Sequence, residues 1–290
     1  MKKAAFIGLG VMGHPMAGHL SKSGLDLTVF NRTRSKAQSW VQEYPGKMAD
    51  SPEDAVRDAD FVFTCVGDDS DLYSIYAEEK GILWGIKQGS IVVDHTTASA
   101  SMAKKLNREL EERGSAFIDA PVSGGQEGAE KAALTIMCGG RPEIYESIVP
   151  IIKAYAKKSV LLGPVGSGQL CKMVNQICVA GVIQGLSEGL FFAEKAGLDL
   201  NKTVEAISKG AAGSWQMENR SETMIKGEFE HGFAVEWMRK DLDICFKEAE
   251  KLGTRLPVTK LIDGLYRKVM EQGGDRWDTS SLIKVLRDND

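Results

Sequence analysis

A single lysine stands in an otherwise apolar stretch of the chain, and an asparagine follows three residues later. Lys172 lies between Leu170-Cys171 and Met173-Val174, and Asn175 comes next. In a helix these two polar side chains project from the same face. A lysine in such a place either extends its charge to water or is partly buried, and partly buried lysines exchange protons near neutral pH. The residues alone leave these interpretations about even, and Gln176 is a weaker polar candidate on the same helix.

A second group of candidates lies in the segment Asp119-Ala120-Pro121-Val122-Ser123-Gly124-Gly125. It follows a predicted strand, and the carboxyl ends of strands in a doubly wound sheet face the ligand crevice. The hydroxyl of Ser123 and the backbone N–H groups of Gly124 and Gly125 are suited to an anion such as a carboxylate. The alternative is an ordinary turn.

A third group is glycine-rich and comes first in the chain. Gly8-Leu9-Gly10-Val11-Met12-Gly13 is a G-x-G-x-x-G between a predicted strand and a predicted helix, the context in which this motif binds a dinucleotide. The first glycine permits the turn, the second admits a pyrophosphate and the third allows the helix to pack on the strand. The helix N-terminus then offers N–H groups and partial positive charge to the phosphates.

The residues after the second predicted strand indicate which dinucleotide is preferred. NAD sites place an acid there to bind the ribose hydroxyls. This chain has Asn31-Arg32-Thr33-Arg34 instead. Arg32 can pair with a 2′-phosphate, and Asn31 and Thr33 can add neutral hydrogen bonds. We therefore expect NADP to be the cofactor, with NAD possible; the alternative is that the two arginines are simply solvated.

Strands and helices alternate through about residue 162, which predicts a Rossmann-type α/β doubly wound sheet. The predicted strands are 4–8, 25–30, 61–66, 90–93, 116–119, 134–138 and 159–162. The predicted helices among them are 10–23, 34–43, one beginning at 52, 72–86 and 100–113.

The pattern changes at Gly163-Pro164-Val165-Gly166-Ser167-Gly168, a cluster of helix and strand breakers. One long apolar helix follows over 169–195, and the rest is predicted to be helical. The predicted helices are 201–209, 215–226, 233–252, 257–271 and 280–287. The expected domains are residues 1–163, which bind NADP, and 164–290, an all-helical domain for substrate and oligomerisation.

Composition limits the class of protein. With 36 basic and 40 acidic residues among 290, the net charge is −4, which argues against a cationic nucleic-acid binder. No uninterrupted apolar run is long enough to predict a membrane helix. The five cysteines form no C-x-x-C pair and, with the four histidines, show no metal-ligand spacing. A reduced cytoplasmic protein with no metal, membrane or nucleic-acid partner is expected.

Together these motifs resemble the β-hydroxyacid dehydrogenase family, which includes 3-hydroxyisobutyrate dehydrogenase, tartronate semialdehyde reductase and the glyoxylate/succinic semialdehyde reductases. The resemblance rests on four segments, which occur in the family's order and spacing over the whole chain. They are Gly8–Ala17, Asp119–Gly125, Gly168–Asn175 and Lys240-Asp241.

The resemblance implies a role for each matching residue. Lys172 is the catalytic acid/base and Asn175 orients substrate and lysine, while the Ser123 loop binds the substrate carboxylate. Further residues are implied to contact cofactor or substrate: Val66, Thr97, Lys240 and Asp241. The family's helical domain mediates dimers or tetramers, so a homo-oligomer is expected. Gly67-Asp68-Asp69 departs from the family, where a Leu-Pro pair is common.

The substrate is the most open question at this stage. Trp215, in an unusually polar segment of the helical domain, either lines the substrate pocket or belongs to the core. Reduction of glyoxylate or succinic semialdehyde by NADPH is the first expectation. Oxidation of 3-hydroxyisobutyrate or an L-serine-type acid is the alternative within the family. A non-catalytic dinucleotide sensor is the alternative of another class.

Overall fold

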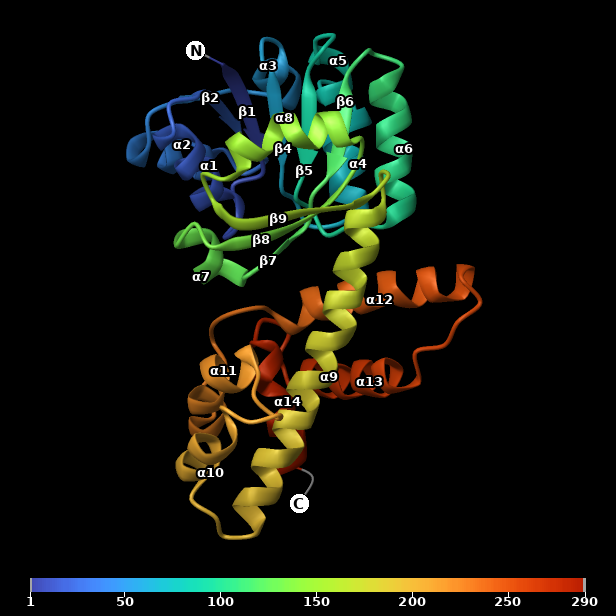
Figure 1. Ribbon diagram of the computed structural model, residues 1–290. Helices are drawn as coiled ribbons and strands as arrows, with labels where there is room; N and C mark the ends of the chain where they lie inside the picture. Colours follow the sequence, from blue (N-terminus) through green and yellow to red (C-terminus); the bar gives the residue numbers. More distant parts are fainter. Residues whose placement is uncertain (1, 289–290) are drawn as a thin grey trace. The chain divides into compact units, whose positions relative to one another are not determined.

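The computed structural model describes residues 2–288, which divide into two compact units at Lys172/Met173. The first unit is built on a nine-stranded sheet, and the second is helical (Figure 1). Both halves of the predicted fold class are confirmed.

Six parallel strands form the main part of the sheet, in the order β3-β2-β1-β4-β5-β6. This order, 3-2-1-4-5-6, is that of a Rossmann fold. The strands are β1 (Lys3–Ile7), β2 (Asp26–Phe30), β3 (Lys47–Met48), β4 (Phe61–Thr64), β5 (Ile91–Asp94) and β6 (Ala116–Asp119). Apart from the exposed Lys3 and the buried Thr64, β1 and β4 are the buried apolar runs expected at the centre of a parallel sheet.

The sheet continues beyond β6 with a change of direction. β8 (Leu134–Gly139) runs antiparallel to β6, and β7 (Val122–Ser123) runs antiparallel to β8. β9 (Ala156–Gly163) is parallel to β8. The Ser123 segment is thus tied to the sheet by β7, which the sequence analysis did not predict because a two-residue strand has no measurable periodicity.

Helices cover both faces of this sheet (Figure 1). One face packs against α1 (Gly13–Lys22), α2 (Arg34–Glu43) and α8 (Pro142–Ile152), and the short α7 (Gly125–Glu130) contacts α1. The other face packs against α3 (Pro52–Val56), α4 (Asp69–Ala77), α5 (Ile82–Gly85) and α6 (Ala100–Glu111). Two separate apolar cores result, one on each side of the strands.

The single helix predicted over 72–86 is wrong. α4 ends at Ala77, and α5 starts at Ile82 after a break that contains Gly81. A Cβ at Gly81 would lie 2.5 Å from the carbonyl oxygen of Tyr76, so the break between the two helices leaves too little space there for any other residue. α7 and α8 were missed, and α8 carries Pro150 in its interior, a residue that argues against a helix when the sequence is read alone.

The second unit is all-helical, as predicted. It consists of α9 (Ser167–Lys195) from Met173 onward, α10 (Leu200–Ile207), α11 (Trp215–Lys226), α12 (Val235–Lys251), α13 (Pro257–Glu271), a 3-10 helix (Thr279–Ser281) and α14 (Leu282–Arg287). Ile183, Met238, Leu242 and Tyr266 lie in its main core, to which α9, α12, α13 and α14 contribute.

α9 is long and apolar enough to cross a membrane by length and composition, although no uninterrupted apolar run predicted such a helix. Core helices of soluble proteins meet the same criterion, and α9 buries Ala180, Ile183 and Leu190 in the two cores of the helical unit.

Candidate active site

The glycine-rich turn between β1 and α1 has the geometry that its sequence predicts. Gly8 has φ +100°, and a Cβ there would lie 2.1 Å from the carbonyl oxygen of Cys65. A Cβ on Gly13 would lie 1.9 Å from the carbonyl oxygen of Gly8, so α1 packs directly on the turn. A Cβ on Gly10 would meet no atom within 4 Å. The second glycine therefore faces open space at a helix N-terminus, as the close approach of a pyrophosphate requires.

Asn31 fixes this turn from the end of β2. Its Oδ1 accepts a hydrogen bond from the N–H of Leu9 at 2.8 Å, and its Nδ2 donates to the carbonyl oxygen of Thr33 at 3.0 Å. Both ends of the amide thus have partners within the chain. The prediction that Asn31 and Thr33 also bind the cofactor stays a prediction.

Arg32 projects into solvent beside this turn. Its side chain is 82% exposed, and its guanidinium pairs with Asp71 of α4 at 2.7 Å. The pair leaves most of the guanidinium surface open to an anion, and no carboxylate follows β2 directly. An exposed guanidinium of this kind is compatible with a 2′-phosphate, and Asp71 holds it in its observed position.

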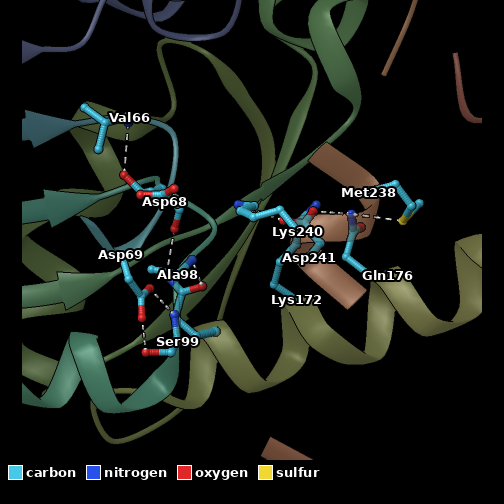
Figure 2. Close-up of polar contacts among 12 residues, drawn as sticks. Val66, Asp68, Asp69, Ala98, Ser99, Lys172, Gln176, Met238, Lys240 and Asp241 are labelled. Atoms are coloured by element: carbon cyan, nitrogen blue, oxygen red, sulfur yellow. Dashed lines mark hydrogen bonds and ion pairs between the residues drawn. The ribbon is translucent and has the colours of Figure 1, made fainter. Parts of the chain in front are cut away.

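The loops after β4 and β5 are tied to each other. The N–H of Val66 donates to Thr96 Oγ1 at 3.1 Å, and Asp69 accepts from both the N–H and the hydroxyl of Ser99, at 2.7 and 2.6 Å (Figure 2). Asp68 caps α4. The departure from the family's Leu-Pro thus has a structural role, because Asp68 starts a helix and Asp69 joins it to the next loop.

Asp94 and His95, at the end of β5, are buried polar residues beneath these loops. Asp94 Oδ1 accepts from Thr64 Oγ1 at 2.7 Å and from the N–H of Thr96 at 3.1 Å, and burial raises the pKa of this carboxyl to about 7. Burial lowers the pKa of His95 to about 4. The neutral imidazole donates from Nδ1 to the carbonyl oxygen of Ala120 and accepts at Nε2 from Tyr155, which orders the start of the Ser123 segment.

Two buried side chains fasten the beginning of α9 to the sheet. The carboxylate of Asp119 accepts from the N–H of Gly166 at 2.7 Å and from that of Gln169 at 2.9 Å, and burial raises its pKa to about 6. The amide of Gln169 accepts from the N–H of Ala98 and donates to the carbonyl oxygen of Thr96. The backbone on both sides of Thr97 is therefore bonded to the same helix that carries Lys172.

Lys172 is buried, so its side chain does not extend to water, which is one of the two interpretations that the sequence left open. The side chain is 9% exposed, and its Nζ donates to the carbonyl oxygen of Val122 at 2.9 Å. Val122 directly precedes Ser123, which is half-buried, and Gly124 and Gly125, which are exposed. The structure thus places an ammonium group against the backbone of the loop predicted to bind a carboxylate.

The remaining predicted residues lie in the helical unit, where most of them form one network. Asn175 Nδ2 donates to Gln176 Oε1 at 2.8 Å, and Gln176 Nε2 donates to Asp241 Oδ2 at 2.6 Å. Asp241 Oδ1 in turn pairs with Lys240 Nζ at 2.8 Å. Trp215 lies outside this network and is 49% exposed, with the guanidinium of Arg220 5.0 Å from its ring centre.

Three residues with a clear structural role at this site received little or no weight in the sequence analysis: Asp119, Gln169 and Gln176. Their partners are distant in the chain, so no local pattern identifies them. For Gln169 and Gln176, the one available signal was the presence of polar residues in an apolar helix. Among residues 2–288, no group of three or more His, Cys, Asp or Glu residues is arranged to hold a metal ion.

The strand order and the glycine-rich first turn define a dinucleotide-binding protein of the Rossmann class, followed by a helical unit. Comparison with protein families narrows this class. Residues 3–163 match the NAD-binding domain of 6-phosphogluconate dehydrogenase, and residues 166–286 match the NAD-binding family of NADP-dependent 3-hydroxyisobutyrate dehydrogenase.

Relatives match over nearly the whole chain. An uncharacterised oxidoreductase of Shewanella frigidimarina is 58% identical over 99% of this chain and 98% of its own length. Probable 3-hydroxyisobutyrate dehydrogenase-like 1 of Arabidopsis thaliana is 40% identical over 98% of this chain and 85% of its own length. Glyoxylate/succinic semialdehyde reductase 2 of the same plant is 30% identical over 97% of this chain and 78% of its own length.

Among solved structures, 3-hydroxyisobutyrate dehydrogenase of Mycobacterium tuberculosis with L-serine superimposes with a TM-score of 0.88. It is 27% identical, and the match covers 99% of each chain. The chain therefore belongs to the β-hydroxyacid dehydrogenase family of NAD(P)-dependent oxidoreductases, and the family resemblance seen in the sequence is confirmed.

Proposed function

We propose that the protein is an NADP(H)-dependent reductase of small aldehyde or keto acids, glyoxylate or succinic semialdehyde, with Lys172 as general acid/base. The observation that carries the proposal is the buried Lys172 ammonium, held 2.9 Å from the Val122 carbonyl oxygen at the start of the Ser123 loop. A proton donor and a predicted carboxylate-binding loop are thereby neighbours within the first unit.

The proposed mechanism assigns one task to each part of the chain. Ser123 and the backbone amides of Gly124 and Gly125 bind the substrate carboxylate. Lys172 donates a proton to the carbonyl oxygen during reduction, and its charge stabilises the oxyanion that develops there. Asn175, three residues later on α9, orients the substrate and Lys172. A bound nicotinamide supplies the hydride.

NADP is the proposed cofactor, with NAD as a weaker substitute. Arg32 is exposed shortly after β2, no carboxylate directly follows β2, and Gly10 leaves room for a pyrophosphate. The other proposed cofactor contacts come from the glycine-rich turn and from Asn31, Thr33, Val66, Thr97, Lys240 and Asp241. Trp215 is proposed to contact the substrate.

The assignment is tested with purified protein and a panel of about twenty short aldehydes and hydroxy acids, each with NADPH and NADH. Lys172→Met should lower kcat by a factor of about 10² to 10⁴, the usual contribution of a general acid. Lys172→Arg should fail as well, because arginine does not release its proton. Lys195→Met, near the exposed end of the same helix, is the matched control. Near-normal turnover by Lys172→Met would disprove the proposed role.

Oxidation of 3-hydroxyisobutyrate or an L-serine-type acid is the second candidate, favoured by the serine named in the mycobacterial structure and by the 40% identical plant relative. The same panel separates the two, since it reports kcat/KM for both directions. A dinucleotide sensor, the candidate from another class, would bind NADPH and turn over no member of the panel.

We also propose that residues 1–163 bind the cofactor, that residues 164–290 bind substrate and form a homodimer or homotetramer, and that the protein is cytoplasmic. An exposed apolar strip on α9 supports self-association. It includes Val174, Cys178, Val182 and Phe192, and a side chain at Gly181, Gly185 or Gly189 would meet no atom within 4 Å. Val182→Asp should shift the protein to a smaller species in analytical ultracentrifugation.

A further inference from the structure

Gln176 occupies the centre of the polar network in the helical unit. Its side chain is 3% exposed, and Figure 2 shows it between α9 and α12, with its amide directed toward Asp241 and Met238. Nε2 lies 2.6 Å from Asp241 Oδ2, and Oε1 lies 2.8 Å from Asn175 Nδ2. The glutamine therefore joins two residues that the proposed mechanism uses for different purposes.

The chemistry of the partners sets the orientation of both amides. A carboxylate only accepts hydrogen bonds, so Gln176 must turn its NH₂ group to Asp241. Its carbonyl oxygen then faces Asn175, which must turn its own NH₂ group to Gln176. The Oδ1 of Asn175 is consequently presented on the opposite side of that amide, as an acceptor. The negative charge on Asp241 thus fixes the orientation of the Gln176 amide. That orientation in turn determines that Asn175 turns its NH₂ group to Gln176 and its Oδ1 away from it.

We propose that Gln176 is a positioning residue that fixes the polarity of Asn175 and the rotation of the Asp241 carboxylate that pairs with Lys240. The Oδ1 of Asn175 can accept a hydrogen bond from the hydroxyl group of an alcohol product or from the ammonium group of a lysine. An Asn175 amide turned the other way could donate to a hydroxyl oxygen but could not bond an ammonium group. The inference rests on the proposed function for its kinetic consequences, because Asn175 and Lys240 are assigned there to substrate and cofactor.

The test compares Gln176→Met with Gln184→Met, which makes the same change at a second buried glutamine two turns further along α9. Gln176→Met keeps the length of the side chain but removes both hydrogen bonds. We expect kcat to fall about tenfold to a hundredfold, the usual effect of a misplaced reacting group. The Kd of NADPH, followed by its fluorescence, should rise several-fold. Gln184→Met should change neither quantity by more than about twofold.

Double variants separate positioning from general support of the fold. If Gln176 acts through Asn175, then adding Gln176→Met to Asn175→Ala should lower kcat little further. In the same way, adding it to Lys240→Ala should leave the Kd of NADPH unchanged. Full additivity in both cycles, or an effect no larger than that of Gln184→Met, would overturn the proposal.

Two further variants allow every outcome of the test to be interpreted. Gln176→Asn retains both polar groups but is one methylene shorter, so it replaces Gln176→Met if the latter does not fold; failure of both to fold would make Gln176 a structural residue and refute the proposal. Lys172→Met reports separately on the proposed function. If it retains turnover, that function fails, while the Kd cycle with Lys240→Ala still decides on Gln176.

Discussion

Asp94 offers a quantitative test of the electrostatics beneath the loops that follow β4 and β5. The carboxyl is fully buried, its Oδ1 accepts two hydrogen bonds, and no described residue bonds its Oδ2. Burial raises its pKa from 3.8 to about 7. The folded protein therefore holds this proton more tightly than the unfolded chain does.

The sign and size of the effect follow from this difference. Because its pKa is raised in the folded state, the contribution of Asp94 to stability is greatest below pH 3.8 and is lost as the pH rises through 7. A pKa difference of 7 − 3.8 corresponds to about 4 kcal/mol of unfolding free energy, of which about 3 kcal/mol is lost between pH 5 and pH 8. Asp94→Asn has no proton to lose, so this dependence should disappear.

Urea unfolding of the two proteins at pH 5, 6, 7 and 8 measures the effect. The free energy of unfolding of Asp94→Asn minus that of the wild type should rise by about 3 kcal/mol over this range. Asp119, which lies opposite Asp94 in the register of β5 and β6 and has a pKa of about 6, is present in both proteins, so its contribution largely cancels. Glu79→Gln, which removes an exposed carboxylate, is the control. A constant difference from pH 5 to pH 8 would refute the reasoning.

Three further predictions concern the cofactor side of the site. Gly10→Ala should leave the Tm nearly unchanged but weaken NADPH binding at least tenfold, because its Cβ fills only the space open to a phosphate; Gly13→Ala should lower the Tm as well, since its Cβ would overlap a carbonyl oxygen of the turn. Arg32→Ala should reduce the ratio of kcat/KM for NADPH to that for NADH about tenfold to a hundredfold, the value of one or two charge-assisted hydrogen bonds. Gln169→Leu leaves a buried N–H and a buried carbonyl oxygen without partners, which should cost about 2–4 kcal/mol and lower the Tm by about 5–12 °C in a thermal melt.

The glycine-rich turn and the order of the two folds along the chain could be predicted because their causes are local. Gly8, Gly10 and Gly13 each act within a few residues, and alternation of apolar runs with helical periods marks a parallel sheet without knowledge of contacts. The same local signals were too weak for β7, which has two residues, and misleading at Pro150 inside α8. Both elements contact the last strands of the sheet, since β7 pairs with β8 and α8 packs against β6 and β9.

The support of Lys172 could not be predicted because it depends on contacts between distant parts of the chain. Asp119 binds an N–H 47 residues away, and Gln169 binds a carbonyl oxygen 73 residues away. In the sequence, Asp119 is one residue of a glycine-rich segment and Gln169 an ordinary helical residue. Only the fold shows that both are buried at the first turn of α9.

The spacing of residues along α9 places three buried polar side chains on one face of this helix. Gln169, Lys172 and Gln176 follow one another at intervals of three and four residues, so they lie on one face over two turns. The first is bonded to the loop after β5, the second to the backbone before Ser123, and the third to Asp241. Because a helix fixes the rise and rotation between its residues, the contact that holds Gln169 also restricts where Lys172 can lie. The placement of the proposed acid/base is thus set by regular secondary structure and two buried side chains, which favours a preorganised site over one assembled by flexible loops.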